Sequence, residues 1–105
     1  MRILLDACVP WPMHRLLAGR ECMTAQQRVL GGIKNGDLLR LTESEFELFI
    51  TADQNTRYQQ NLAGRSIPIP ELSTNKLRRL SAAATSIQSA ITAMKPGEFR
   101  HLEIP

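Results

Sequence analysis

The feature that most constrains the fold of this chain is a short apolar run that meets an aspartate, and it occurs twice. Residues 3–5 (ILL) lead directly into Asp6, and residues 48–51 (LFIT) are followed two positions later by Asp53. A run that is apolar on both faces favours a strand buried on both sides of a parallel sheet. The two runs therefore predict two inner strands, each with an acid near its carboxyl end.

The segments between these runs alternate in the same manner along the whole chain. Further strands are expected over 21–25, 66–72 and 98–104, and helices from Pro12 to Gly19, over 35–45, over 55–62, and over 77–94 with a break near Leu80. Such a βαβαβαβαβ order predicts an α/β fold, a mainly parallel sheet of about five strands with helices on both faces. Residues 1–105 are expected to form a single domain, since 43% of them are apolar and 22% are charged.

Two prolines predict a weak place in this sheet. Pro68 and Pro70 are two residues apart in the fourth strand, so both missing N–H groups face the same neighbouring strand. We expect few or no ladder bonds on that side over residues 67–70.

Composition narrows the classes of function. The two cysteines, Cys8 and Cys22, form no metal-binding or disulfide pattern, which favours a reducing compartment. The first apolar run is too short for a signal peptide or a membrane span, so a cytoplasmic protein without membrane association is expected. Neither GxGxxG nor GxxxxGK[ST] occurs, which argues against dinucleotide and P-loop sites. The net charge of +3 gives only a mild preference for polyanions.

The chain holds only three aspartates, Asp6, Asp37 and Asp53. In a parallel sheet they are expected at one edge, the edge formed by the carboxyl ends of the strands. Carboxylates gathered there repel one another unless a cation offsets their charge. Mg²⁺ prefers oxygen ligands, and such an ion can activate water against a phosphodiester. The alternative is that each aspartate caps a turn or a helix.

Polar residues near the same edge are candidates for binding a phosphate backbone. Arg57 follows Asp53 on the predicted third helix, and Ser73, Asn75 and Lys76 follow the fourth strand. Arg78 and Arg79 extend this basic side, although a solvated helix face is the simpler explanation for these two arginines.

Four segments, ILLDACVP, LGGIKNGDLL, FITADQNTRYQQNLAG and LSTN, together resemble the small bacterial PIN-like family over nearly the whole chain. This family is related to the toxin ribonucleases of toxin–antitoxin operons. The resemblance implies a Rossmann-like PIN fold and a ribonuclease that depends on Mg²⁺ or Mn²⁺. It also implies that Asp6, Asp37 and Asp53 are the catalytic and metal-binding acids. RNA, a cognate antitoxin protein and a second copy in a homodimer are the expected partners.

The sequence departs from the family at two positions. Asn35 and Asn55 stand where relatives often carry acids, and an amide is a weaker metal ligand than a carboxylate. We count both asparagines as substrate-binding candidates, with helix N-caps as their alternative role. The alternative function is a catalytically weak PIN-like module that binds RNA or a protein partner.

Overall fold

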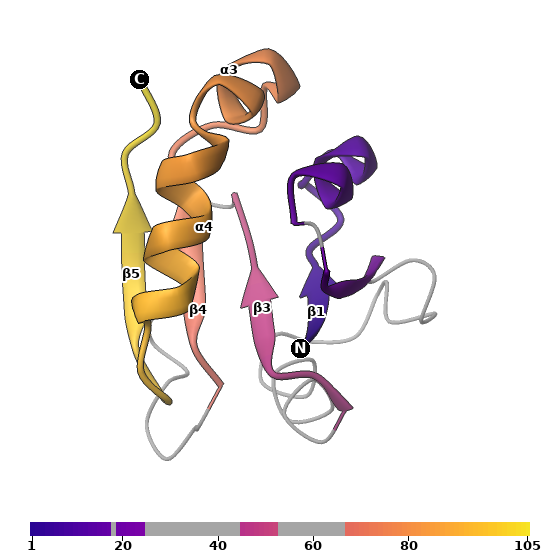
Figure 1. Ribbon diagram of the computed structural model, residues 1–105, viewed down its shortest axis with the longest axis vertical. Helices are drawn as coiled ribbons and strands as arrows, with labels where there is room; N and C mark the ends of the chain where they lie inside the picture. The colour runs from indigo at the N-terminus through magenta and orange to yellow at the C-terminus, as the bar shows by residue number, and fades with distance from the viewer. Residues whose placement is uncertain (18, 25–44, 53–66) are drawn as a thin grey trace.

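The computed structural model describes residues 1–17, 19–24, 45–52 and 67–105. Within them the chain is a mixed α/β protein whose strands are all parallel (Figure 1). The strands are β1 (Arg2–Leu5), β2 (Glu21–Thr24), β3 (Leu48–Ile50), β4 (Ile69–Leu72) and β5 (Phe99–Leu102). The helices are the 3₁₀ helix η1 (Trp11–Leu16) and the α-helices α3 (Leu77–Ala82) and α4 (Ala84–Ala93). The expected α/β class and parallel strands are confirmed.

The strands form two ladders that lie next to each other. β1 is central in the first, with order β2-β1-β3, and β4 pairs with β5 in the second. Backbone bonds join the two ladders, because Thr51 N–H donates to Pro70 O (3.2 Å) and Leu72 N–H donates to Thr51 O (2.7 Å). The strands therefore follow one another in the order β2, β1, β3, β4, β5, as Figure 1 shows for the labelled strands.

The seam between β3 and β4 has the predicted deficit of donors. Phe49 N–H donates to Pro68 O (3.2 Å) and Thr51 N–H donates to Pro70 O (3.2 Å). The prolines accept these two bonds and return none, since they have no N–H group. On the other side of β4, Ile69 N–H donates to Glu98 O (2.8 Å), so β4 keeps its ladder with β5.

Alternate residues of β1 enter two apolar clusters. Ile3 and Leu5 belong to the larger cluster, which the helices η1, α3 and α4 complete. Leu4 belongs to the smaller cluster, with Phe46, Phe49, Ile67 and Ile69. Because Ile3, Leu4 and Leu5 are fully buried, the expectation of a strand covered on both sides is confirmed for this part of β1.

The helices differ in detail from the sequence-based expectation. The first is a 3₁₀ helix with a proline in its first turn. The break in the last helical segment lies at Ala83 and not near Leu80, and it lets α3 contribute Leu80 and α4 contribute Ile87 to the same cluster. Gly19, where the first helix was expected to end, and Gly97, which follows the last helix, have φ of 81° and 77°, where side chains are disfavoured.

Two predicted helices, over 35–45 and 55–62, fall almost entirely outside the described residues. Among the helices that the structure describes, none is long and apolar enough to cross a membrane.

Candidate functional site

Asp6 is fixed at the carboxyl end of the central strand β1. Its backbone N–H donates to Ile50 O (2.9 Å), which extends the pairing of β1 with β3 by one step. Its side chain is buried, with the residue only 7% exposed. Oδ1 accepts a hydrogen bond from Ala7 N–H (2.8 Å). A carboxylate is costly to bury without hydrogen bonds, so hydrogen-bond donors such as the Ala7 N–H stabilise the buried Asp6 side chain.

Thr51, directly after β3, is a side-chain partner of Asp6. Its Oγ1 donates to Asp6 Oδ2 over 2.8 Å, and Thr51 is fully buried. The carboxyl ends of β1 and β3 thus lie side by side, at the edge of the sheet where the sequence predicts the acids. Asp53 follows Thr51 by two residues and lies outside the described part of the chain.

Cys8, in the turn after β1, lies against the Asp6 carboxylate. Its Sγ donates to Asp6 Oδ2 (3.5 Å) and accepts from Ala52 N–H (3.4 Å). Burial, followed by the negative charge of Asp6, raises the pKa of the Cys8 thiol. The sulfur therefore stays protonated at neutral pH and acts here as a weak donor, not as a nucleophile.

The loop after β4 reaches the same turn. Asn75 Nδ2 donates to Cys8 O (3.4 Å), which brings an exposed amide beside the Asp6 turn. Lys76 is exposed at the start of α3, and its N–H donates to Thr74 Oγ1 (3.2 Å). Of the two predicted phosphate-binding residues, Asn75 contacts the candidate site directly, and Lys76 follows it in the chain.

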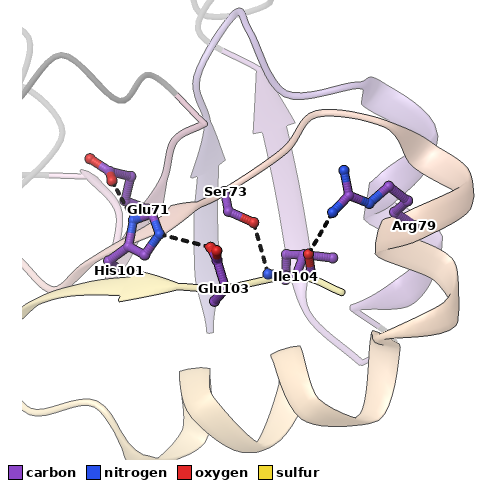
Figure 2. Close-up of polar contacts among 6 residues, drawn as sticks. All are labelled: Glu71, Ser73, Arg79, His101, Glu103 and Ile104. Carbon is purple, nitrogen blue, oxygen red and sulfur yellow. Dashed lines mark hydrogen bonds and ion pairs between the residues drawn. The ribbon is translucent and has the colours of Figure 1, made fainter.

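Two other residues of the predicted basic side contact the chain beyond β5 (Figure 2). Ser73 Oγ accepts the N–H of Ile104 (2.7 Å). Arg79 donates from Nη2 to Ile104 O (2.8 Å) and from Nε to Pro105 O (2.9 Å). Arg78 and Arg79 are both exposed, and of the two Arg79 binds and stabilises the segment after β5.

A second polar cluster, to which the sequence assigned no role, lies on β4 and β5 (Figure 2). His101 Nδ1 lies 2.6 Å from Glu71 Oε1, and Nε2 lies 3.1 Å from Glu103 Oε2. The hydrogen bond to Glu71, and secondarily that to Glu103, raises the pKa of His101. The signal for this cluster is spacing: Glu71 and His101 are in register on paired strands, and Glu103 follows two positions later.

The Asp6 carboxylate can supply one ligand of a magnesium or manganese site. Mg²⁺ keeps several waters and binds through one or two carboxylates. Asp6 offers one such carboxylate, and among the described residues no group of three or more His, Cys, Asp or Glu side chains gathers around a common point. The other predicted site residues, Asp37, Asp53, Asn35, Asn55 and Arg57, lie outside the described residues.

Sequence reasoning missed the two residues that hold the Asp6 carboxylate, Thr51 and Cys8. The available signal was position, because Thr51 is the last residue of an apolar run and Cys8 lies in the turn after Asp6. No protein-family model matches the chain, and no curated protein or solved structure matches it either. A function for the chain therefore rests on the geometry around Asp6.

Proposed function

We propose that the protein is a metal-dependent ribonuclease of the PIN-like type and the toxin component of a toxin–antitoxin pair. One observation carries the proposal. A buried carboxylate, Asp6, ends the central parallel strand and is hydrogen-bonded to Thr51 at the end of the adjacent strand. Ligands of open α/β sheets bind at this edge, and Asp53 follows Thr51 closely in the sequence.

In this proposal Asp6, Asp37 and Asp53 would hold one Mg²⁺ or Mn²⁺ ion. When bound, such an ion would supply an activated water and would stabilise negative charge that develops on the phosphoryl oxygens. Thr51 orients the Asp6 carboxylate, because its hydroxyl donates to Oδ2 from a fully buried position. A ligand held in this way loses little further freedom when it binds a cation.

The phosphate backbone of RNA is the substrate that this edge suits. Lys76 and Arg78 place exposed positive charge at the start of α3, and the exposed amide of Asn75 lies beside the Asp6 turn. Contacts of this type bind phosphates without reading sequence. Arg57, Ser73, Asn35 and Asn55 remain further candidates for substrate binding.

A second candidate function is a PIN-like module that binds RNA or a protein without cleaving it. It is favoured by Asn35 and Asn55, which stand where relatives of the PIN-like family often carry acids. The two candidate functions differ in whether Asp6 takes part in RNA cleavage.

Cleavage of a panel of single-stranded and structured RNAs, with Mg²⁺ or Mn²⁺, tests the proposal. Asp6→Asn and Asp53→Asn should each lower the cleavage rate at least about 100-fold, as expected when charge stabilisation by a metal is lost. RNA binding measured in Ca²⁺ should change little, because the acids hold the ion and not the bulk of the RNA. Arg78→Ala should do the reverse and also flatten the salt dependence of binding.

Asn55→Asp is the matched gain-of-function variant. If the asparagine limits turnover, the added carboxylate should tighten Mn²⁺ binding and raise the cleavage rate. RNA binding without cleavage by either the wild type or Asn55→Asp would establish the binding module instead. Absence of both RNA binding and RNA cleavage would overturn the ribonuclease and the RNA-binding module, and only a module that binds a protein would remain. Growth arrest on expression of the wild type, but not of Asp6→Asn, would test the toxin role.

A further inference from the structure

The outer edge of β5 presents backbone groups that bond to nothing in the described part of the chain. Ile69 N–H donates to Glu98 O (2.8 Å) and Ser73 N–H donates to Leu102 O (3.0 Å), so these even-numbered residues face β4. Because backbone groups alternate in direction along a strand, the N–H and C=O groups of Phe99, His101 and Glu103 face away from β4. Such an edge is a template for pairing with another strand.

We propose that this edge pairs with the same edge of a second copy of the chain, antiparallel, about a two-fold axis at Leu102. Closed two-fold dimers are the commonest assemblies of identical chains, and they place one patch against itself. Each copy would donate the N–H groups of His101 and Glu103 to its partner and accept two bonds in return. The strands of the two copies would then form one continuous sheet across the interface.

Charge decides the register. An axis at Leu102 sets His101 directly opposite Glu103 of the other copy, twice in each dimer. An axis at His101 would set the two histidines opposite each other, and an axis at Arg100 would do the same to two arginines. Opposite charges across a strand pair stabilise and like charges destabilise, so the register centred on Leu102 is the one selected. Contacts with Glu71 and Glu103 favour the charged imidazole.

Helix α4 lies on the β5 side of the molecule and has a surface suited to packing against a second copy of the chain. α4 packs on the β5 side of the core through Ile87 and Ile91, with Leu102 and Ile104 in the same cluster. From Ser81 to Met94 the sequence carries no charged residue, although 22% of the chain is charged. A hollow of about 230 Å³ lies between this helix and the end of β5, and Ala83, Ser86 and Ile87 line its helical side. Two such helices can approach without burying a charge.

This dimer leaves the Asp6 edge uncovered. β1 and β5 are separated by β3 and β4, and the antiparallel pairing points the carboxyl ends of the two copies in opposite directions. The inference is thus independent of the proposed ribonuclease activity, and either can fail without the other.

Sedimentation equilibrium of the full chain from about 1 to 300 µM tests the dimer, since an interface of this small extent is expected to be weak. The expected result is a monomer–dimer equilibrium. Glu103→Pro removes an outward N–H without touching the β4 ladder and should abolish the dimer, whereas the control Glu103→Ala should retain it. Unchanged melting temperatures would show that both variants fold.

Charge reversal tests the register. Glu103→Lys should weaken self-association about tenfold, because both cross-strand pairs become repulsive. His101→Glu should do the same, and a mixture of the two variants should form a mixed dimer in which both pairs are again opposite in charge. A chain that stays monomeric throughout the concentration range overturns the proposal. So does a dimer that survives Glu103→Pro, because the interface would then lie elsewhere.

Discussion

The hydrogen bond between Thr51 and Asp6 joins the two strand ends of the candidate site, and Thr51→Val removes it together with the longer contact of Thr51 Oγ1 with Cys8 Sγ (3.8 Å). Valine has nearly the same shape as threonine and the same preference for extended backbone, so the change leaves no cavity. It removes the Oγ1 donor that lies 2.8 Å from Asp6 Oδ2. Thr51 is fully buried and Asp6 is 7% exposed, so water does not readily replace the lost donor.

The expected loss of stability in Thr51→Val follows from the charge of the Asp6 carboxylate, which accepts the hydrogen bond. A hydrogen bond to a charged group contributes about 1.5–3 kcal/mol, and the donors from Ala7 and Cys8 stay in place, which favours the lower half of that range. For a domain of this size we expect the melting temperature to fall by about 6–18 °C.

Urea unfolding followed by circular dichroism, in metal-free buffer, measures the effect. Thr85→Val, the same change at an exposed position of α4, should alter the free energy of unfolding by less than about 0.5 kcal/mol. Combined with Asp6→Asn in a double-mutant cycle, Thr51→Val should show a coupling energy of about 1 kcal/mol or more. Equal stability of Thr51→Val and the wild type, or additive effects in the cycle, would refute the reasoning.

Three further predictions concern the rest of the fold. Arg79→Ala should lower the free energy of unfolding by about 1–2 kcal/mol through loss of two charge-assisted bonds to backbone carbonyls, while Arg78→Ala should stay within about 0.5 kcal/mol in the same urea assay. The raised pKa of His101 means that its ionised form stabilises the fold below about pH 6.5 and that this contribution is lost as pH rises through the raised value. The imidazole is half exposed, so the amplitude should stay under about 1 kcal/mol, and His101→Gln should remove this part of the pH profile. Gly19→Ala should cost about 1 kcal/mol from its φ of 81° alone, since an added Cβ would meet nothing within 4 Å; an unchanged melting temperature would contradict this.

The parallel sheet could be predicted from sequence because its signals are local. β1 and β3 are apolar on both faces, and each is followed by polar residues that end the strand. Pro68 and Pro70 predicted the missing donors toward β3 for the same reason, since a missing N–H is a property of the residue itself. The position of the helix break was missed by a few residues, because the packing of Leu80 and Ile87 into one cluster decides it and no capping side chain marks it.

The candidate site was predictable only in part. The place of Asp6 followed from topology, but its partners Thr51 and Cys8 depend on side-chain geometry at the ends of two strands that are distant in sequence. The role of Arg79 was not visible either, since the carbonyls that it binds lie 25 and 26 residues further along the chain. Contacts of this kind arise from the fold and leave no pattern in the sequence.

The most direct test of the central claim is anomalous scattering from crystals soaked in Mn²⁺. The account predicts one manganese peak within bonding distance of a carboxylate oxygen of Asp6, with Asp53 among the other ligands, and no such peak in Asp6→Asn crystals. A soak that places manganese elsewhere on the molecule and leaves the Asp6 carboxylate bonded only to Thr51, Ala7 and Cys8 would contradict it.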